Sequence, residues 1–272
     1  MMNIGVFDSG LGGLTILKEL LKKLPQYNYV YLGDNARVPY GGKSDEVIYS
    51  YIQEAVDFLF KKNCELIILA CNTATAVALR KIQQEYLPKT YPNRRVLGVI
   101  RPTVETVVKE GFKRIGLIGT HALVISKSFI KELKKFDASI EVYQQACPLL
   151  VPIIEEGEIE WAGLDLILKK YLEPLKAKGV ECLILGCTHY GLIDDKIQLL
   201  AGKKIRIISE GKITADKLIT YLKRHPEIEK KLTKKGKRSY YVTDLSERYK
   251  KMIKVFLGKS FDKKDILRIA RI

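Results

Sequence analysis

Residues 66–75 read LIILACNTAT, and residues 183–191 read LILGCTHYG. Each stretch begins as a continuous apolar run, which is typical of a strand buried on both faces of a parallel sheet. Each run ends beside a cysteine, Cys71 in the first and Cys187 in the second, and polar residues follow at once. The two stretches therefore predict an α/β fold in which two buried strands each end at a thiol.

Strand and helix patterns alternate along the rest of the chain. Short apolar runs bounded by turn residues predict strands, and apolar residues at a helical period predict the helices between them. The predicted strands are 3–10, 27–34, 65–70, 114–120, 139–146, 181–186 and 204–209. The predicted helices are 14–25, 44–63, 73–86, 126–136 and 160–179, with Lys-rich helices after residue 209. This alternation predicts parallel sheets covered by helices on both faces.

The pattern of the first half returns in the second half. IGVFDSG, from residue 4, corresponds to IGLIGTH, from residue 115, and a strand-end cysteine follows each motif at nearly equal spacing. We interpret this as two similar α/β domains. Because ligands of parallel sheets bind outside the carboxyl ends of the strands, both cysteines are candidates for one active site.

Composition excludes several classes of protein. The 272 residues, 47% hydrophobic and 29% charged, are typical of a globular protein. No apolar run reaches the roughly 18 residues of a membrane span, and the N-terminus lacks a secretory pattern. We therefore expect a cytoplasmic protein with no membrane partner. The five cysteines fit neither a disulfide framework nor the usual zinc spacing, so no metal is expected.

Most of the net charge of +16 lies in residues 203–272, which hold 22 Lys and Arg against 8 Asp and Glu. A basic segment of this kind indicates either nucleic-acid binding or a solvated lysine-rich surface. The lysines are interleaved with apolar residues at helical spacing, and no nucleic-acid motif accompanies them. We favour the solvated surface and do not expect a nucleic-acid partner.

The strand-end thiols point to acid–base chemistry. Each is predicted to precede a helix N-terminus, where free N–H groups favour an anion and lower the pKa of a thiol. Two thiols on opposite sides of a cleft suit a two-base exchange, in which a thiolate removes a proton from one face of a carbon and a thiol returns one to the other face. The remaining cysteines, Cys64 at a helix end, Cys147 and Cys182, are interpreted as buried and inert.

Polar residues near the predicted strand ends are candidates for assisting this exchange. Asp8 and Ser9 end the first strand, and Asp8 is suited to bind a substrate ammonium group or to move a proton, or else to cap a turn. Glu155 and His189 are the comparable candidates in the second half. The sequence is equally compatible with a structural role for His189.

Seven motifs resemble the glutamate racemase family in order and spacing, over nearly the whole chain. They are FDSGLGG, GDNARVPYG, ACNTAT, IGLIGT, PLLVPIIEEG, LILGCTHY and YYVTDLSERY. ACNTAT with GCTHY is typical of the wider group of two-cysteine amino-acid racemases, and DSGLGG with ARVPYG narrows the likeness to glutamate racemases. A racemase of another acidic amino acid, such as aspartate, is the alternative.

The resemblance implies a cofactor-independent racemase, an isomerase that interconverts L- and D-glutamate and supplies D-glutamate for peptidoglycan synthesis, cell-wall biogenesis and cell shape. It implies that Cys187 is the base for L-glutamate and Cys71 the base for D-glutamate. It further implies that Asp8 assists Cys71, while Glu155 and His189 assist Cys187. The positions that match the family's substrate contacts are Asp8, Ser9, Tyr40, Gly41, Asn72, Thr73, Thr120, Thr188 and His189.

The resemblance also implies a homodimer and two flavodoxin-like three-layer domains, related by a pseudo-twofold axis, with the active site between them. Residues 1–98 and 210–272 would form the first domain, with Asp8 and Cys71, and residues 99–209 the second, with Glu155 and Cys187. Two positions depart from the family pattern, Leu123 in place of a frequent threonine and Arg101 in place of a frequent acidic residue. We expect these to affect local substrate contacts and the hinge.

Three other functions are less compatible with the sequence. GLGGLT begins like a dinucleotide-binding GxGxxG motif, but Thr15 stands at the third glycine position. A dithiol redox protein usually carries a CxxC motif, which is absent from this sequence. A nucleic-acid-binding module would have only the charge of residues 203–272 to support it.

Overall fold

The computed structural model describes residues 2–261 and 265–272. The strands of these residues form two parallel sheets, one with the order β10-β9-β2-β1-β3-β4 and one with the order β6-β5-β7-β8. The first sheet contains β1 (Asn3–Asp8), β2 (Tyr29–Gly33), β3 (Cys64–Leu69), β4 (Arg95–Gly98), β9 (Arg238–Val242) and β10 (Ile266–Ile269). The second contains β5 (Arg114–Gly119), β6 (Glu141–Ala146), β7 (Cys182–Gly186) and β8 (Arg206–Ile208). The predicted α/β class with parallel sheets is confirmed.

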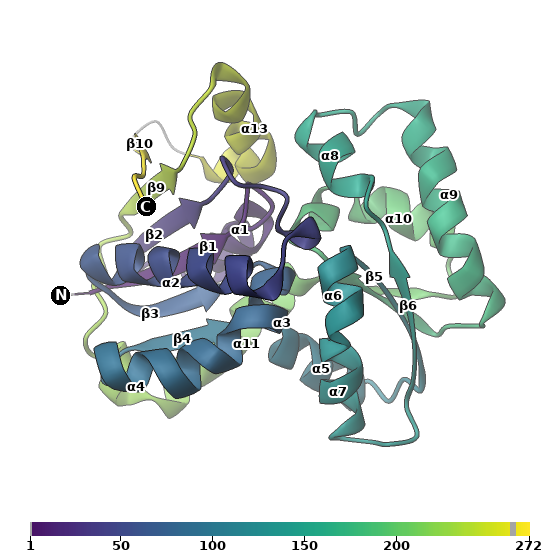
Figure 1. Ribbon diagram of the computed structural model, residues 1–272, viewed down its shortest axis with the longest axis horizontal. Coiled ribbons are helices and arrows are strands. Elements are labelled where there is room, and N and C mark those ends of the chain that lie inside the picture. The colour runs from purple at the N-terminus through teal and green to yellow at the C-terminus, as the bar shows by residue number, and fades with distance from the viewer. Residues whose placement is uncertain (1, 262–264) are drawn as a thin grey trace.

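Figure 1 shows the two sheets in two lobes, with both chain ends in the first lobe. The strands at the centres of the sheets are buried along their whole length, as their continuous apolar sequences require; β3 and β7 are examples. In the first sheet β2 lies on one side of β1 and β3 on the other, and in the second sheet β6 and β7 flank β5 in the same way. The point where the chain crosses from one side to the other lies between β1 and β3 in the first sheet and between β5 and β7 in the second.

Helices cover both faces of each sheet. On the first sheet α1, α11 and α13 pack on one face and α2 and α3 on the other; on the second sheet α9 and α10 pack opposite α5 and α7. No helix of the described residues is long and apolar enough to cross a bilayer. The α-helices are α1 (Leu14–Lys23), α2 (Asp45–Lys61), α3 (Asn72–Lys81), α4 (Leu87–Thr90), α5 (Ile100–Lys109), α6 (His121–Ser126), α7 (Ser128–Lys134), α8 (Leu150–Glu155), α9 (Ala162–Ala177), α10 (Asp194–Ala201), α11 (Glu210–Arg224), α12 (Pro226–Glu229) and α13 (Glu247–Leu257).

Local predictions were wrong at three places. Cys64 does not end a helix but begins β3, because α2 ends at Lys61 and Asn63 takes a left-handed conformation with φ of 58°. The segment after residue 209 contains β9 and β10 besides its helices, because β9 pairs with β2 of the first sheet. Helix α6 lies before the predicted helix at 126–136, and Lys127, with φ of 53°, separates α6 from α7.

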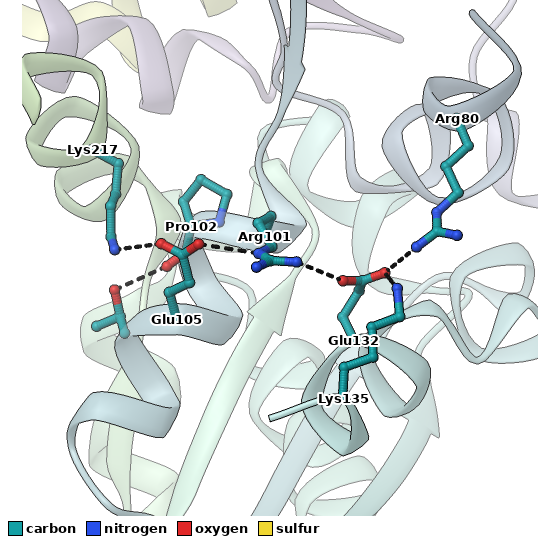
Figure 2. A network of polar contacts seen from close by, with 8 residues as sticks. Arg80, Arg101, Pro102, Glu105, Glu132, Lys135 and Lys217 are labelled. Atoms are coloured by element: carbon teal, nitrogen blue, oxygen red, sulfur yellow. Dashed lines mark hydrogen bonds and ion pairs between the residues drawn. The ribbon is translucent and has the colours of Figure 1, made fainter. Parts of the chain in front are cut away.

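A network of ion pairs connects helices of the two lobes (Figure 2). Glu132, on α7 of the second lobe, lies 2.7 Å from Arg80 on α3 of the first lobe and 3.5 Å from Arg101 on α5. Glu105, on α5, lies 3.1 Å from Arg101 and 2.6 Å from Lys217 on α11. Arg101, one of the two departures from the family pattern, therefore lies between two carboxylates, Glu105 of its own helix and Glu132 of α7.

Candidate active site

The two crossing points of the sheets place the candidate thiols. Cys71 follows β3, beside the end of β1 at Asp8, and Cys187 follows β7, beside the end of β5. Parallel sheets bind ligands at such crossing points, outside the carboxyl ends of the strands. The two lobes thus present their thiols from equivalent positions, and both thiols line one cavity.

Cys71 is the residue that caps the N-terminus of α3. Its sulfur accepts a hydrogen bond from the backbone N–H of Ala74 at 3.5 Å and lies 3.4 Å from the hydroxyl of Ser9. The predicted lowering of its pKa is wrong for this conformation, because burial, with a smaller contribution from Asp8, raises the pKa of Cys71 to about 12. The hydrogen bonds that Cys71 donates to Ser9 and accepts from Ala74 act in the opposite direction but are outweighed. Burial therefore favours the protonated form of the Cys71 thiol.

Cys187 precedes a short 3₁₀ helix, Thr188–Leu192, and has different neighbours. Its sulfur lies 3.7 Å from Nδ1 of His189, whose Nε2 lies 2.8 Å from Oε1 of Glu155. The other carboxylate oxygen, Oε2, accepts a hydrogen bond from the hydroxyl of Tyr249 at 3.4 Å. A buried carboxylate, an imidazole and a thiol are therefore arranged in sequence, and the imidazole and the thiol line the cavity.

The contacts of His189 with Glu155 and Cys187 favour the charged form of its imidazole ring. Burial alone would lower the pKa of His189, but the hydrogen bonds with Cys187 and Glu155 outweigh it and raise the pKa well above its ordinary value. An imidazolium at this position can donate its Nδ1 hydrogen to the Cys187 sulfur. The two thiols are therefore unequal, since a cation lies against Cys187 and a carboxyl group near Cys71.

Asp8 lies behind the cavity and joins the two lobes. It is fully buried, and it accepts hydrogen bonds from the backbone N–H of Gly10 at 3.0 Å and from the hydroxyl of Thr188 at 3.1 Å. Burial raises the pKa of Asp8, although His189 and the hydrogen bonds reduce the rise. Asp8 therefore contacts residues of both strand ends without lining the cavity itself.

Glycines allow the lobes to approach closely around the site. A Cβ atom at Gly12, in the DSGLGG motif, would lie 2.4 Å from Nδ1 of His189 and 2.4 Å from Oγ1 of Thr188. A Cβ atom at Gly41 would lie 2.6 Å from Cβ of Thr120. Real Cβ atoms do not come so close to other atoms, so both motifs require glycine where the lobes meet.

The cavity between the lobes is small. Its volume is about 20 Å³, which is about the space of one water molecule and far less than that of an amino acid. Ten of the predicted site residues line it together with Val38, Pro39, Val151 and Gly186. These ten are Ser9, Tyr40, Gly41, Cys71, Asn72, Thr73, Thr120, Cys187, Thr188 and His189.

Four residues singled out from the sequence do not present a free polar group to the cavity. Asp8 and Glu155 lie behind the lining and contact it through Thr188 and His189. Tyr40 lines the cavity, but its hydroxyl donates a hydrogen bond to Asp34. Leu123 is fully buried, and its side chain packs against Gly119 and Gly186. This leucine belongs to the core of the second lobe and not to the cavity surface.

Sequence reasoning missed Glu210, a buried carboxyl group next to the site. Glu210 follows β8 and begins α11, and it accepts a hydrogen bond from Nδ2 of Asn72 at 2.6 Å. The rule that identified the two thiols, a polar residue at the end of a parallel strand, applies to it as well. Glu210 was not identified because it lies in a segment that we interpreted as a lysine-rich surface.

The chain is similar to known amino-acid racemases. The family model for Asp/Glu/Hydantoin racemase matches residues 9–218. The chain is 42% identical over 265 residues to the glutamate racemase of Aquifex aeolicus (strain VF5), a stretch that covers 97% of each chain.

Solved structures of similar proteins share the whole fold. The glutamate racemase isoform RacE1 from Bacillus anthracis is 32% identical, with a TM-score of 0.89 over 100% of this chain and 98% of that one. The glutamate racemase from Francisella tularensis subsp. tularensis SCHU S4, solved in complex with D-glutamate, is 33% identical, with a TM-score of 0.86 over 100% and 97%. With its paired strand-end thiols and these likenesses, the chain belongs to the Asp/Glu/hydantoin racemase family and, within it, to the glutamate racemases.

Proposed function

We propose that the protein interconverts L- and D-glutamate by proton transfer between two thiols, Cys71 and Cys187. The observation that carries the proposal is their placement at equivalent crossing points of two sheets, on one cavity. Glutamate is preferred to aspartate because the relative that matches over 97% of both chains is named for glutamate.

The two thiols exchange one proton in each turnover. With L-glutamate bound, the thiolate of Cys187 takes the α-proton from one face, and the thiol of Cys71 gives its proton to the opposite face of the planar carbanion. D-Glutamate leaves, with Cys71 now the thiolate and Cys187 the thiol, and the reverse reaction restores the first state. Two coupled thiols of this kind titrate as a pair.

The surroundings of the thiols support different starting states for the two. Burial favours the protonated form of the Cys71 thiol, while the Cys187 sulfur lies beside the imidazole of His189, which Glu155 holds. This difference supports Cys187 as the base for L-glutamate. We propose that His189 and Glu155 assist Cys187, that Asp8 assists Cys71, and that the polar residues of the cavity lining bind the substrate.

We further propose two domains, residues 1–98 with 210–272 and residues 99–209. The membership of the sheets supports this division, because the strands of the first sheet lie in the outer segments and those of the second in the inner one. By its family, we propose that the protein is a cytoplasmic homodimer and that its D-glutamate serves peptidoglycan synthesis, the cell wall and cell shape.

Incubation with L-glutamate in heavy water tests the proposed reaction. The optical rotation should fall to zero without added cofactor, and one deuterium should enter the α-carbon of each product molecule. Aspartate under the same conditions should react far more slowly. Unchanged rotation together with an unlabelled α-carbon would exclude the reaction.

A further inference from the structure

Glu210 is a carboxyl group enclosed in the protein interior without an opposite charge. It is 4% exposed, and its hydrogen-bond partners are two neutral side chains, Asn72 on α3 and Thr103 on α5. Within residues 2–261 and 265–272 it takes part in no hydrogen bond or ion pair with Lys, Arg or His. Buried ionised carboxylates are normally paired with a cation, so the surroundings of Glu210 favour a neutral acid.

The number of hydrogen-bond donors around Thr103 also indicates that Glu210 is protonated. The Thr103 hydroxyl lies 3.0 Å from the carbonyl oxygen of Val99 and 3.3 Å from Oε1 of Glu210. A hydroxyl has one hydrogen to donate, and a carbonyl oxygen can only accept. If Thr103 donates to Val99, the second contact is a hydrogen bond only when Glu210 carries a proton on Oε1. A neutral Glu210 therefore satisfies every group in this set.

The second carboxyl oxygen of Glu210, Oε2, holds the side-chain amide of Asn72 in place. Nδ2 of Asn72 donates to Oε2 of Glu210 at 2.6 Å, while Oδ1 of Asn72 is buried and has no partner in the described part of the chain. Asn72 also lines the cavity that holds both thiols. Its unpartnered oxygen is therefore free to accept a hydrogen from a ligand in that cavity.

We propose that Glu210 is a positioning residue of the racemase site: as a neutral acid it holds the Asn72 amide so that Oδ1 accepts a hydrogen bond from the α-ammonium group of the substrate. An α-ammonium group supplies the N–H donor that this oxygen lacks. The inference rests on the proposed function, because it assigns the ligand of Asn72 from the amino acid that the site would racemise.

The charges around Glu210 agree with this protonation state. Burial raises the pKa of Glu210 to about 8, Asp8, from the end of β1, acts in the same direction, and the hydrogen bonds with Asn72 and Thr103 reduce the rise. Glu19 of α1 packs against the adjoining Gly211, but Lys22 pairs with it. Of the cations on elements packed against α11, Lys22 and Lys23 of α1 pair with Glu19 and Asp216, and His189 pairs with Glu155.

The variants Glu210→Gln and Glu210→Leu test the proposal. Glutamine can accept from Nδ2 of Asn72 and donate to Thr103, so its KM for glutamate should stay close to that of the wild type. Leucine releases the amide, so KM should rise roughly tenfold, with a smaller change in kcat, as expected for one weakened hydrogen bond to a charged group. An unchanged KM in Glu210→Leu would overturn the orienting role.

Stability against pH gives a second readout that does not depend on activity. In the unfolded chain Glu210 ionises near its ordinary pKa, but in the folded protein it keeps its proton to about pH 8. Wild-type stability relative to Glu210→Gln should therefore fall as pH rises between these values, by about tenfold in the unfolding equilibrium constant per pH unit. A difference that does not change with pH would show that Glu210 is ionised, and would overturn the proposal even if Glu210→Leu failed to fold.

Glu181→Gln is the matched control for the pH series. Glu181 accepts hydrogen bonds from the backbone N–H groups of Lys113 and Arg114, which lower its pKa. It is ionised in both states from about pH 5 upward, so its stability difference should be flat over the same range. If the wild type racemises no glutamate but the Glu210 series still depends on pH, the proposed function fails while the neutral state of Glu210 stands.

Discussion

The side-chain oxygens of Thr73 and Thr120 lie 2.9 Å apart, so a direct hydrogen bond joins the two lobes at the lining of the cavity. Thr73 comes from α3 of the first lobe, and Thr120 caps α6 of the second. The space behind them is about 20 Å³. This volume is too small for glutamate, so we expect the lobes to separate during each turnover.

Thiol labelling should detect this opening. All the cysteines are buried, but only Cys71 and Cys187 line the closing cavity. Iodoacetamide should therefore modify Cys71 and Cys187 faster than Cys64 and Cys182, which lie in strands of the sheets. Peptide mass spectrometry at timed intervals would give the four rates, and saturating D-glutamate should slow the first two. Equal rates at all four would contradict opening at the lobe interface.

Replacing either cavity thiol with serine should nearly abolish racemisation. Serine is a much weaker acid than cysteine, so Cys71→Ser and Cys187→Ser should each lower kcat by about 10²-fold or more. The circular dichroism of glutamate measures the rate. Cys147→Ser is the control, because its sulfur lies 3.6 Å from the Gln145 carbonyl and a serine hydroxyl can replace that contact. Substantial activity in either cavity variant would remove that thiol from the mechanism.

Glu155→Gln should weaken the imidazolium beside Cys187. Losing the charged partner removes one of the interactions that raise the pKa of His189, so His189 should lose its proton at lower pH. The alkaline limb of the pH–rate profile should therefore move to lower pH, and kcat/KM should fall roughly tenfold to a hundredfold. Because the two enantiomers have equal free energies, kcat/KM must fall equally in both directions.

Glu156→Gln is the control for that experiment. Glu156 adjoins Glu155, but it is exposed and pairs with Arg248. Its replacement should leave the pH profile in place. A Glu155→Gln profile that coincides with that of the wild type would contradict a role for the carboxylate in holding the charge of His189.

Glu132→Gln should change the closing of the lobes more than the stability of the fold. The variant removes the pairing of Arg80 and Arg101 with Glu132, but exposed ion pairs contribute only about 0–1 kcal/mol each. We expect a small shift in Tm and a rise in KM at low salt. The rise should disappear in about 1 M NaCl, where the Debye length is about 3 Å.

Asp137→Asn is the control that distinguishes the effect of the ion-pair network from a general effect of surface charge. Asp137 pairs with Lys113, but both residues lie within the second lobe. Its KM should match that of the wild type at every salt concentration. The same salt dependence in both variants would show that the network of Figure 2 has no particular effect on closure.

The buried strands and the two thiols could be predicted because their signals are local. Apolar runs such as LIILA identify a buried strand without knowledge of its neighbours, and a polar residue at the end of such a run indicates a site. The likeness between the two halves then suggested that Cys71 and Cys187 act together. These inferences needed only the order of residues along the chain.

Features that depend on distant partners were beyond the sequence. The protonation of Cys71 depends on burial that the second lobe completes, and burial outweighs the effect of the α3 N-terminus. The function of Glu210 depends on Asn72 and Thr103, each more than a hundred residues away. β9 was missed because its short sequence, RSYYV, becomes a strand by pairing with β2.

The position of β9 and β10 in the first sheet affects how the chain folds as it leaves the ribosome. β8, the last strand of the second sheet, is synthesised before either of them, so that sheet can be complete while the first still lacks one flank. Until β9 arrives, β2 presents an unpaired edge, and such edges invite pairing with other chains. A nascent chain stalled soon after residue 224 should therefore be a better chaperone substrate than the finished protein.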